Sequence, residues 1–272
     1  MKLISRISVS AGLLLVLMST VGCTKLRARD QLVKGVQAFK GGHYEEAVNH
    51  FQTSVDLDPN YDAARLYLAT AYSYQVVPNL DTPDNLKLAQ KALDGFHAVL
   101  AKNPDDLDAL RQVASIERNI KQYDQAKKDE LKIIALDPKD AEANYTIGVI
   151  DWTQAYKNAT TILGAAGLTD DGNGNPKKSK DVCAKIVTAN TTLVAAAMKY
   201  LQAAVDINPN YDDAMQYLNL AERRKADMEC GNDNARKADV AAADAWVLKA
   251  SGARKANELA KEKKAGGGVN MQ

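Results

Sequence analysis

DLDPNYDAA, residues 56–64, is the stretch on which the chain is organised, because three close variants of it follow. They are AKNPDDLDA at 101–109, ALDPKDAEA at 135–143 and DINPNYDDA at 206–214. Each copy follows one apolar helical run, turns at a proline and begins another run. Proline cannot continue the preceding helix, and it fixes a turn from which the next helix starts. The sequence therefore predicts pairs of helices joined at proline turns.

The spacing of these turns points to a repeat protein. Pro59, Pro104, Pro138 and Pro209 are separated by 45, 34 and 71 residues. Two helices in about 34 residues are typical of tetratricopeptide repeats, and the chain resembles that family. The resemblance implies an all-α fold, a right-handed superhelical solenoid of about five helix hairpins with a C-terminal capping helix. Relative to the 34-residue spacing, the other two spacings are longer by 11 and 37 residues, which places insertions near 73–84 and 156–190.

The resemblance rests on small and large residues at fixed places in each hairpin. Small residues let the two helices approach closely, and large residues fill the space between hairpins, so that stacked hairpins bury what one alone cannot. The first helices carry Gly35, Ala69, Ala114 and Gly148 at the small position, and the second helices carry Ala47, Ala92, Ala126 and Ala197. Large residues follow one turn later as Phe51, Phe96 and Leu201, whereas Ser54, Glu117 and Glu130 depart from the pattern.

Two other interpretations of the spacing were open. A generic helical bundle would also show apolar helices and turns, but not four proline turns of one kind. The 71-residue spacing could also hold two repeats, but the hidden copy would place Lys185 where close approach needs a small residue. One repeat with a long insertion is therefore the preferred interpretation.

The first 22 residues have the pattern of a secretory signal. Lys2 and Arg6 precede a mostly apolar run at 7–18, which is too short to span a bilayer comfortably. The ending Thr20-Val21-Gly22-Cys23 resembles a bacterial lipoprotein signal. The resemblance implies acylation of Cys23 and, with Thr24 next, an outer-membrane lipoprotein facing the periplasm. Ordinary cleavage after Gly22 and an uncleaved anchor are the alternatives.

The sequence divides into four expected segments. They are a signal peptide at 1–22, a tether at 23–30, the repeat array at 31–250 and a polar C-terminal tail at 251–272. The stretch GLTDDGNGNPKKSK at 167–180 is rich in turn residues and is expected to be a mobile loop. A last helix at 234–248 is expected to cover the exposed end of the array.

Little in the sequence suggests catalysis, and neither a cofactor nor a metal ion is expected. A formal net charge of +1 gives no reason to expect a nucleic-acid partner. His43, His50 and His97 lie in repeat hairpins, as exposed or packed residues. The acids Asp58, Asp105, Asp137 and Asp212 at the repeat turns are expected to cap helices. Asp171, Asn173 and Asn175 alternate as in a calcium loop, but Pro176 and Val182 stand where that loop needs glycine and glutamate.

Cys183 and Cys230 are the two cysteines that follow Cys23 in the sequence. If Cys23 is acylated, these two cysteines remain in an oxidising compartment. Cys183 lies near the start of one long helix, and Cys230 lies near the end of the helix after Pro209. In an antiparallel pair these ends meet, so a disulfide is predicted, with two separate thiols as the alternative.

The resemblance implies a concave groove lined by the first helix of each hairpin. The residues that it places on this wall are Leu66, Thr70, Tyr74, Arg111, Ser115, Arg118, Asn119, Tyr145, Val149, Trp152, Gln216, Leu220 and Arg223. Arg111 with Arg118, and Tyr145 with Trp152, are each seven residues apart on one helix, so one continuous patch of arginines and aromatics is predicted. The alternative is that the 167–180 loop covers Trp152. The lysines and asparagines with which some members of the family hold peptide C-termini are not matched.

These features favour a non-catalytic scaffold, lipid-anchored in the bacterial envelope, that binds a protein or peptide partner in its groove. Two other classes were considered. An enzyme or accessory subunit of cell-wall metabolism would need its site in the 164–180 insertion. A glycan-binding module would use Tyr145 and Trp152 as stacking platforms.

Overall fold

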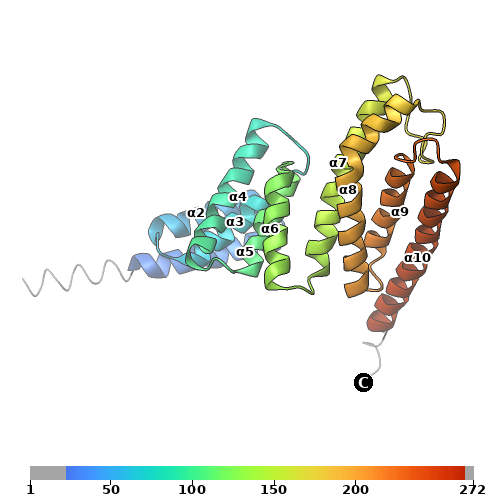
Figure 1. Ribbon diagram of the computed structural model, residues 1–272. Helices are drawn as coiled ribbons and strands as arrows, with labels where there is room; N and C mark the ends of the chain where they lie inside the picture. The colour runs from blue at the N-terminus through green and yellow to red at the C-terminus, as the bar shows by residue number, and fades with distance from the viewer. Residues whose placement is uncertain (1–22, 267–272) are drawn as a thin grey trace, which may run out of the picture. The chain divides into compact units, whose positions relative to one another are not determined.

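The computed structural model describes residues 23–266, and every regular element within them is a helix (Figure 1). The first helix covers residues 23–40. It is followed by α2 (Tyr44–Leu57), α3 (Asp62–Ser73), α4 (Pro83–Lys102), α5 (Leu107–Asn119), α6 (Tyr123–Leu136), α7 (Ala141–Ala165), α8 (Lys180–Ile207), α9 (Asp212–Ala226) and α10 (Asp233–Gly266). The expected signal peptide lies outside the described residues.

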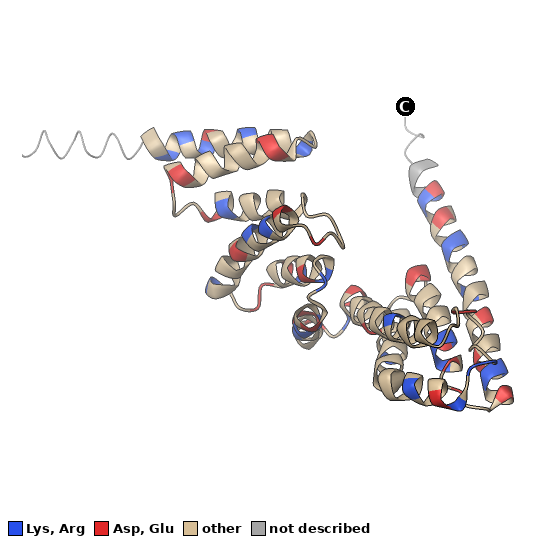
Figure 2. Cartoon of the chain, turned by 90° about the horizontal axis from the view of Figure 1, so that it is seen from above, with Lys and Arg blue, Asp and Glu red and all other residues tan. Residues whose placement is uncertain are grey.

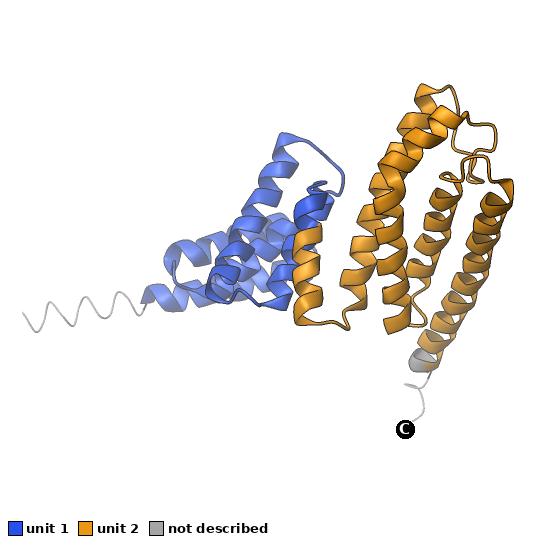
Figure 3. Cartoon of the chain, in the orientation of Figure 1, with its two compact units in different colours: residues 1–126 blue, residues 127–272 orange. Residues whose placement is uncertain are grey.

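The chain divides into two compact units, residues 1–126 and 127–272, and the division falls within α6 (Figure 3). Each unit builds helix hairpins in the predicted way. The proline turns at Pro59 and Pro138 connect α2 to α3 and α6 to α7, and the turn at Pro209 connects α8 to α9. The all-α prediction and the hairpin order are confirmed.

The caps at these turns differ from the predicted ones. Asp106 and Asp140 accept hydrogen bonds from the backbone N–H groups of Ala109 and Ala143, at 3.0 and 2.8 Å, and so begin α5 and α7. Asp58 does not cap a helix and instead accepts from the N–H of Asn60 within the turn, at 3.2 Å. Asp137 does the same with Lys139 N at 3.1 Å. The acids before Pro59 and Pro138 therefore shape their turns.

The first unit packs small residues against large ones. A Cβ atom on Gly35 would lie 2.4 Å from Phe51 Cε1, so only glycine lets Phe51 sit in its buried place. Ser54, where alanine is usual, is fully buried, and its hydroxyl donates to the carbonyl oxygen of Ala28 at 2.7 Å. The expected tether at 23–30 is therefore wrong, because these residues are helical and Ala28 is packed against α2.

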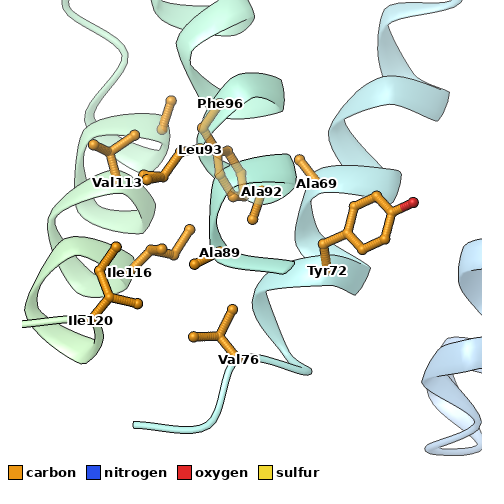
Figure 4. Close-up of a cluster of buried hydrophobic side chains, with 11 residues drawn as sticks. Ala69, Tyr72, Val76, Ala89, Ala92, Leu93, Phe96, Val113, Ile116 and Ile120 are labelled. Atoms are coloured by element: carbon orange, nitrogen blue, oxygen red, sulfur yellow. The ribbon is translucent and has the colours of Figure 1, made fainter. Parts of the chain in front are cut away.

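The centre of the first unit lies among α3, α4 and α5. Phe96 and Leu93 from α4 meet Val113 and Ile116 from α5 in an apolar cluster (Figure 4). Phe96 stands at a large position of the repeat pattern and is 1% exposed. The cluster explains why the longer second repeat keeps a regular hairpin despite its insertion.

The second unit is built on long antiparallel helices. A Cβ atom on Gly148 would lie 2.5 Å from Leu201 Cγ, which repeats in α7 and α8 the packing seen at Gly35. Further along the same pair, Asn190 is fully buried and donates to the carbonyl oxygen of Ala155 at 2.8 Å. The insertion thus lengthens both helices of the hairpin and ends in the loop between them (Figure 1).

The C-terminal helix is longer than expected. α10 runs from Asp233 to Gly266 without a break, so residues 251–266 are helical instead of a separate tail. Ala250 and Ala253 are buried against Met215 of α9. Arg254 lies 2.9 Å from the carboxylate of Asp212. These contacts extend the capping helix beyond residue 250, the predicted end of the array. The last residues, 267–272, lie outside the described residues.

Candidate functional site

Five aromatic rings of the second unit make a continuous row, called here the aromatic ladder. α7 supplies Tyr145, Trp152 and Tyr156, and α9 supplies Tyr217, with Tyr211 directly before its first residue. Tyr145 and Trp152 were predicted to share one helix face. Both contact Tyr217 of α9.

The rings follow one another at contact distance. Their centroids lie 5.0 Å apart for Tyr211 and Tyr145, and 5.7 Å for Tyr145 and Tyr217. Tyr217 meets Trp152 edge to face at 5.1 Å. Trp152 and Tyr156 are stacked at 5.3 Å with an angle of 18° between their planes. Edge-to-face and stacked pairs of this kind add to the stability gained by burial.

One end of the ladder is charged and the other hydrogen-bonded. The guanidinium of Arg224 lies 5.5 Å from the centre of the Tyr156 ring, in a cation–π contact. At the other end Tyr211 Oη donates to Glu142 Oε2. Burial, and then the hydrogen bond to Glu142, raises the pKa of Tyr211. That hydroxyl therefore stays protonated and keeps its ring in place.

The ladder is partly exposed. Tyr156 is 41% exposed, whereas Trp152 is half-buried against the cluster that holds Leu201 and Leu218. The indole Nε1 of Trp152 is buried and makes no hydrogen bond within the described residues. Trp152 is thus partly a core residue, and Tyr156 is the ring most open to a partner. The repeat pattern missed Tyr156, because this residue lies on the extension of α7 beyond an ordinary repeat helix.

Other predicted groove residues of this unit have different surroundings. Gln216, Val149 and Leu220 are half-buried. Arg223 donates to the carbonyl oxygen of Gly172 and to Asp244, both at 2.7 Å. Its guanidinium therefore connects the insertion loop to α9 and α10.

The insertion loop is held by buried charges. Arg224 binds both carboxylate oxygens of Asp170 at 2.8 Å and lies 2.8 Å from Asp227 Oδ2. Arg224 is 3% and Asp227 0% exposed. Arg236 of α10 donates to the carbonyl oxygen of Asn173 at 2.6 Å. The prediction of a mobile loop is therefore wrong, because composition shows turn residues but not the distant arginines that fix them.

The pKa values of two carboxylates in this cluster are shifted in opposite directions. Burial raises the pKa of Asp227 from 3.8 to about 6, although Arg224 opposes the shift. Burial also opposes ionisation of Asp170, but the hydrogen bonds from Arg224 and Gly172 outweigh it and lower the pKa of Asp170. Asp170 is therefore the firm partner of Arg224.

The residues that alternate as in a calcium loop bond to one another. Asp171 Oδ1 accepts from the N–H groups of Asn173 and Asn175, at 2.8 and 2.9 Å. Asn175 Oδ1 accepts from Asp171 N at 3.3 Å. Among residues 23–266 no group of three or more histidines, cysteines or acids is placed to hold a metal ion.

The predicted disulfide is confirmed. Cys183 Sγ and Cys230 Sγ are bonded at 2.04 Å, with their Cα atoms 5.6 Å apart. The bond joins the first turn of α8 to the turn between α9 and α10, beside the insertion loop. Cys23 is free and exposed. No helix of the described residues is long and apolar enough to cross a membrane.

The first unit contains the remaining groove candidates. Tyr74 is 58% exposed, and its ring contacts Phe39 and Tyr44. Leu66 lines a pocket of about 230 Å³ between α3 and α4. The other candidates here are Thr70, Arg111, Ser115, Arg118 and Asn119, all half-buried. The patch predicted to join Arg111 and Arg118 to Tyr145 and Trp152 spans the two units, and it stays a prediction.

The comparisons with known proteins find similar structures but no matching family model or curated sequence. No protein-family model and no curated protein sequence matches the chain. The structure is similar to that of a MamA fragment from Desulfovibrio magneticus RS-1, with a TM-score of 0.54 and 18% identity over 85% of this chain and 96% of that one. A second MamA crystal structure gives a TM-score of 0.53 and 16% identity over 90% and 97%. YrrB, described as a TPR protein with an unusual peptide-binding site, gives a TM-score of 0.49 and 13% identity over 88% and 97%.

At these low sequence identities, the similarity shows the fold alone. The likeness to MamA agrees with what the chain itself shows. Its hairpins are joined by turns at Pro59, Pro138 and Pro209, and Gly35 and Gly148 pack against large residues of the paired helix. The chain therefore has the tetratricopeptide-repeat fold.

Proposed function

We propose that this chain is a non-catalytic scaffold that binds a protein partner through the first helices of its hairpins. The aromatic ladder is the observation that supports the proposal most. Partly exposed aromatic rings on a rigid backbone provide contact area at a small entropic cost, and they are enriched among the residues that dominate binding energy. α7 and α9, which carry the ladder, are both first helices of hairpins.

The proposed partner is an apolar or amphipathic segment of a protein. Tyr156 offers an exposed ring, and its neighbour Trp152 is held by packing, so a bound side chain would meet a surface that needs no reordering. A pre-organised surface keeps more of its contact energy as affinity.

The other two classes have less support. A sugar stacked on Trp152 would compete with Tyr156, which stacks on the indole, and with Tyr217, which meets it edge to face. An active site in the insertion would need free carboxylates, but Asp170 binds Arg224 and Asp171 binds the loop backbone. Protein binding is therefore the function that this surface favours.

The proposal includes a lipid anchor on Cys23, in an outer-membrane lipoprotein that faces the periplasm. Its support is the sequence that ends at Gly22-Cys23 and the exposed thiol of Cys23. Cells producing the wild type and Cys23→Ser should be labelled with a radioactive fatty acid and fractionated. Label on the wild type alone, with loss of the variant from membranes, is expected. An unlabelled wild type would reject acylation.

Partner binding is tested by photo-crosslinking in cells. A benzophenone amino acid replaces Tyr156 in one strain and Leu248 of α10, which is 76% exposed, in another. An adduct with a second protein is expected from position 156 but not from position 248. The same adduct from both positions, or none from position 156, would contradict binding at the ladder.

A further inference from the structure

Cys23, the residue that would carry the lipid, is the first described residue of the first helix. Residues 23–40 are one helix, with no loop between Cys23 and the packed part of the unit. Its inner face holds Ala28 and Leu32, which are 0% and 9% exposed, and the hydroxyl of Ser54 donates to the carbonyl oxygen of Ala28. The orientation of this helix on the first unit is therefore fixed by packing.

Two large apolar side chains lie on its outer face. Leu26 is 69% and Val33 is 55% exposed. They are seven residues apart, two helical turns, and so they point in nearly the same direction. Neither side chain packs against the rest of the unit, because Ala28 and Leu32 on the opposite face of the helix are the buried ones.

Basic residues flank this apolar strip. Lys25 and Arg27 directly precede and follow Leu26, so they lie on either side of it around the helix, and Arg29 lies one turn further on. All three are exposed, and none pairs with an acid among residues 23–266. The acid of this segment, Asp30, is 2.7 Å from Lys34. Figure 2 shows Lys and Arg recurring along this helix.

We propose that this face lies on an anionic phospholipid surface and acts as a second membrane contact beside the lipid. The inference rests on the proposed acylation of Cys23. Leu26 is three residues from that anchor, a rise of about 4.5 Å along the helix, so an acylated chain brings this face to the bilayer. Apolar residues bordered by lysine and arginine are typical of helices that bind the membrane surface.

The contact would also orient the protein. A flexible tether would let the array turn freely, whereas a helix that includes the anchor residue and lies on the surface fixes the first unit relative to the membrane. Each basic residue near an anionic membrane strengthens binding about fivefold, so three of them together provide about a hundredfold.

The test uses vesicles and the unacylated protein, so that it does not depend on the lipid. The chain from residue 23 onward, with Cys23→Ser, contains every residue that the structure describes. Its binding to vesicles of phosphatidylcholine alone, or with one-quarter phosphatidylglycerol, is measured by co-sedimentation at low and high salt. Binding to the phosphatidylglycerol vesicles, weakened by salt, is expected.

Three variants locate the contact. Lys25, Arg27 and Arg29 all changed to glutamine should weaken binding about a hundredfold, and Leu26→Glu with Val33→Glu should abolish it. Leu248→Glu, at an exposed leucine of α10, is the control and should bind as the parent chain does. Melting curves check that each variant is folded, which exposed positions lead us to expect.

Each other outcome overturns the proposal. These outcomes are no binding to phosphatidylglycerol vesicles at low salt, equal binding to both lipids, and unchanged binding of the glutamine variant. Fatty-acid labelling of Cys23 in cells is a separate measurement. Vesicle binding without labelling would reject the lipid anchor but keep the membrane face, and labelling without vesicle binding would do the reverse.

Discussion

The two insertions of this repeat array are held in different ways. The short one, between α3 and α4, is organised around a single buried amide, with Asn79 N donating to the carbonyl oxygen of Asn119 at 2.8 Å and Asp81 paired with Lys121 at 2.7 Å. Asn85 accepts from Val77 N at 2.7 Å and donates to the carbonyl oxygens of Val77 and Leu80 at 2.9 and 2.7 Å. The long one, between α7 and α8, is held by Arg224, Arg236 and the disulfide of Cys183 and Cys230.

The difference follows from length and charge. A short loop has few backbone groups to satisfy, and one amide with two donors and an acceptor can satisfy most of them. The long loop places a carboxylate, Asp170, over the buried end of α9, and a buried charge needs an opposite charge. In the long insertion each ion depends on the others. The ion cluster should therefore hold its loop more strongly than the amide holds the short one, and breaking it should cost more stability.

The largest expected effect is that of Arg224→Ala. This change leaves Asp170 and the buried Asp227 without their cation, and removing one partner from a buried ion pair costs about 3–5 kcal/mol. Urea unfolding measures the loss. Arg224→Met combined with Asp170→Asn and Asp227→Asn should recover much of it, because no ion is then left unpaired. A loss below about 1 kcal/mol for Arg224→Ala would show that the cluster does not hold the loop.

Removing the disulfide should cost somewhat less. Changing Cys183 and Cys230 to serine frees a loop closed over 47 residues. The chain-entropy account gives a loss of about 2–4 kcal/mol. The comparison is between the double variant and the oxidised wild type in thermal unfolding without reductant. Equal stability would mean that the ions alone position the end of α8.

Asp227→Asn should reveal the pH dependence of the cluster. The pKa of Asp227 is about 6 in the folded chain against an ordinary 3.8, so the folded chain binds the proton more tightly. Ionisation of Asp227 therefore lowers stability as the pH rises from about 4 to 7. The variant cannot ionise, and its advantage over the wild type should grow across this window to at most about 3 kcal/mol.

Urea unfolding at several pH values between 4 and 7.5 measures that difference. The exposed Asp124→Asn variant on α6 is the matched control. A difference that stays constant with pH would mean that Asp227 is ionised throughout, and its burial would then carry no cost.

Asn85→Ala should have the smallest effect of the four. It leaves the N–H and carbonyl of Val77 and the carbonyl of Leu80 without their partner. Water can reach part of this loop, because Val77 and Leu80 are 51% and 40% exposed, so a loss of about 2 kcal/mol is expected. Lys87→Ala, at an exposed site on the same helix, is the control. A loss as large as that of Arg224→Ala would erase the contrast between the insertions.

The repeat pattern predicted much of the fold because it records packing between neighbouring helices. Gly35 and Gly148 stand where a Cβ atom would collide with a large residue of the paired helix. Ser54 was a departure with no explanation in the pattern. Its hydroxyl bonds to Ala28, in a segment that local sequence suggested was a tether.

The candidate site was predictable only in part, for a related reason. Tyr145 and Trp152 occupy groove positions of the repeat, so their shared face could be predicted. Tyr156 lies on the helix extension, where the pattern has no position, and Arg224 contacts Asp170 across 54 residues. Contacts that depend on how an insertion folds back leave no periodic signal, so neither residue could be assigned from the sequence.

The most direct test of the binding surface is the affinity of the crosslinked partner segment for Tyr156→Ala. Tyr156 is the most exposed ring of the ladder, so its removal should cost less stability than Trp152→Ala, which would also loosen the packing around Leu201. A loss of affinity of about 2 kcal/mol, roughly thirtyfold, is predicted, with a small fall in melting temperature from the lost contacts of the ring with Trp152 and Arg224. Leu248→Ala should bind as the wild type does. Unchanged affinity of Tyr156→Ala would contradict the assignment of the ladder as the binding surface.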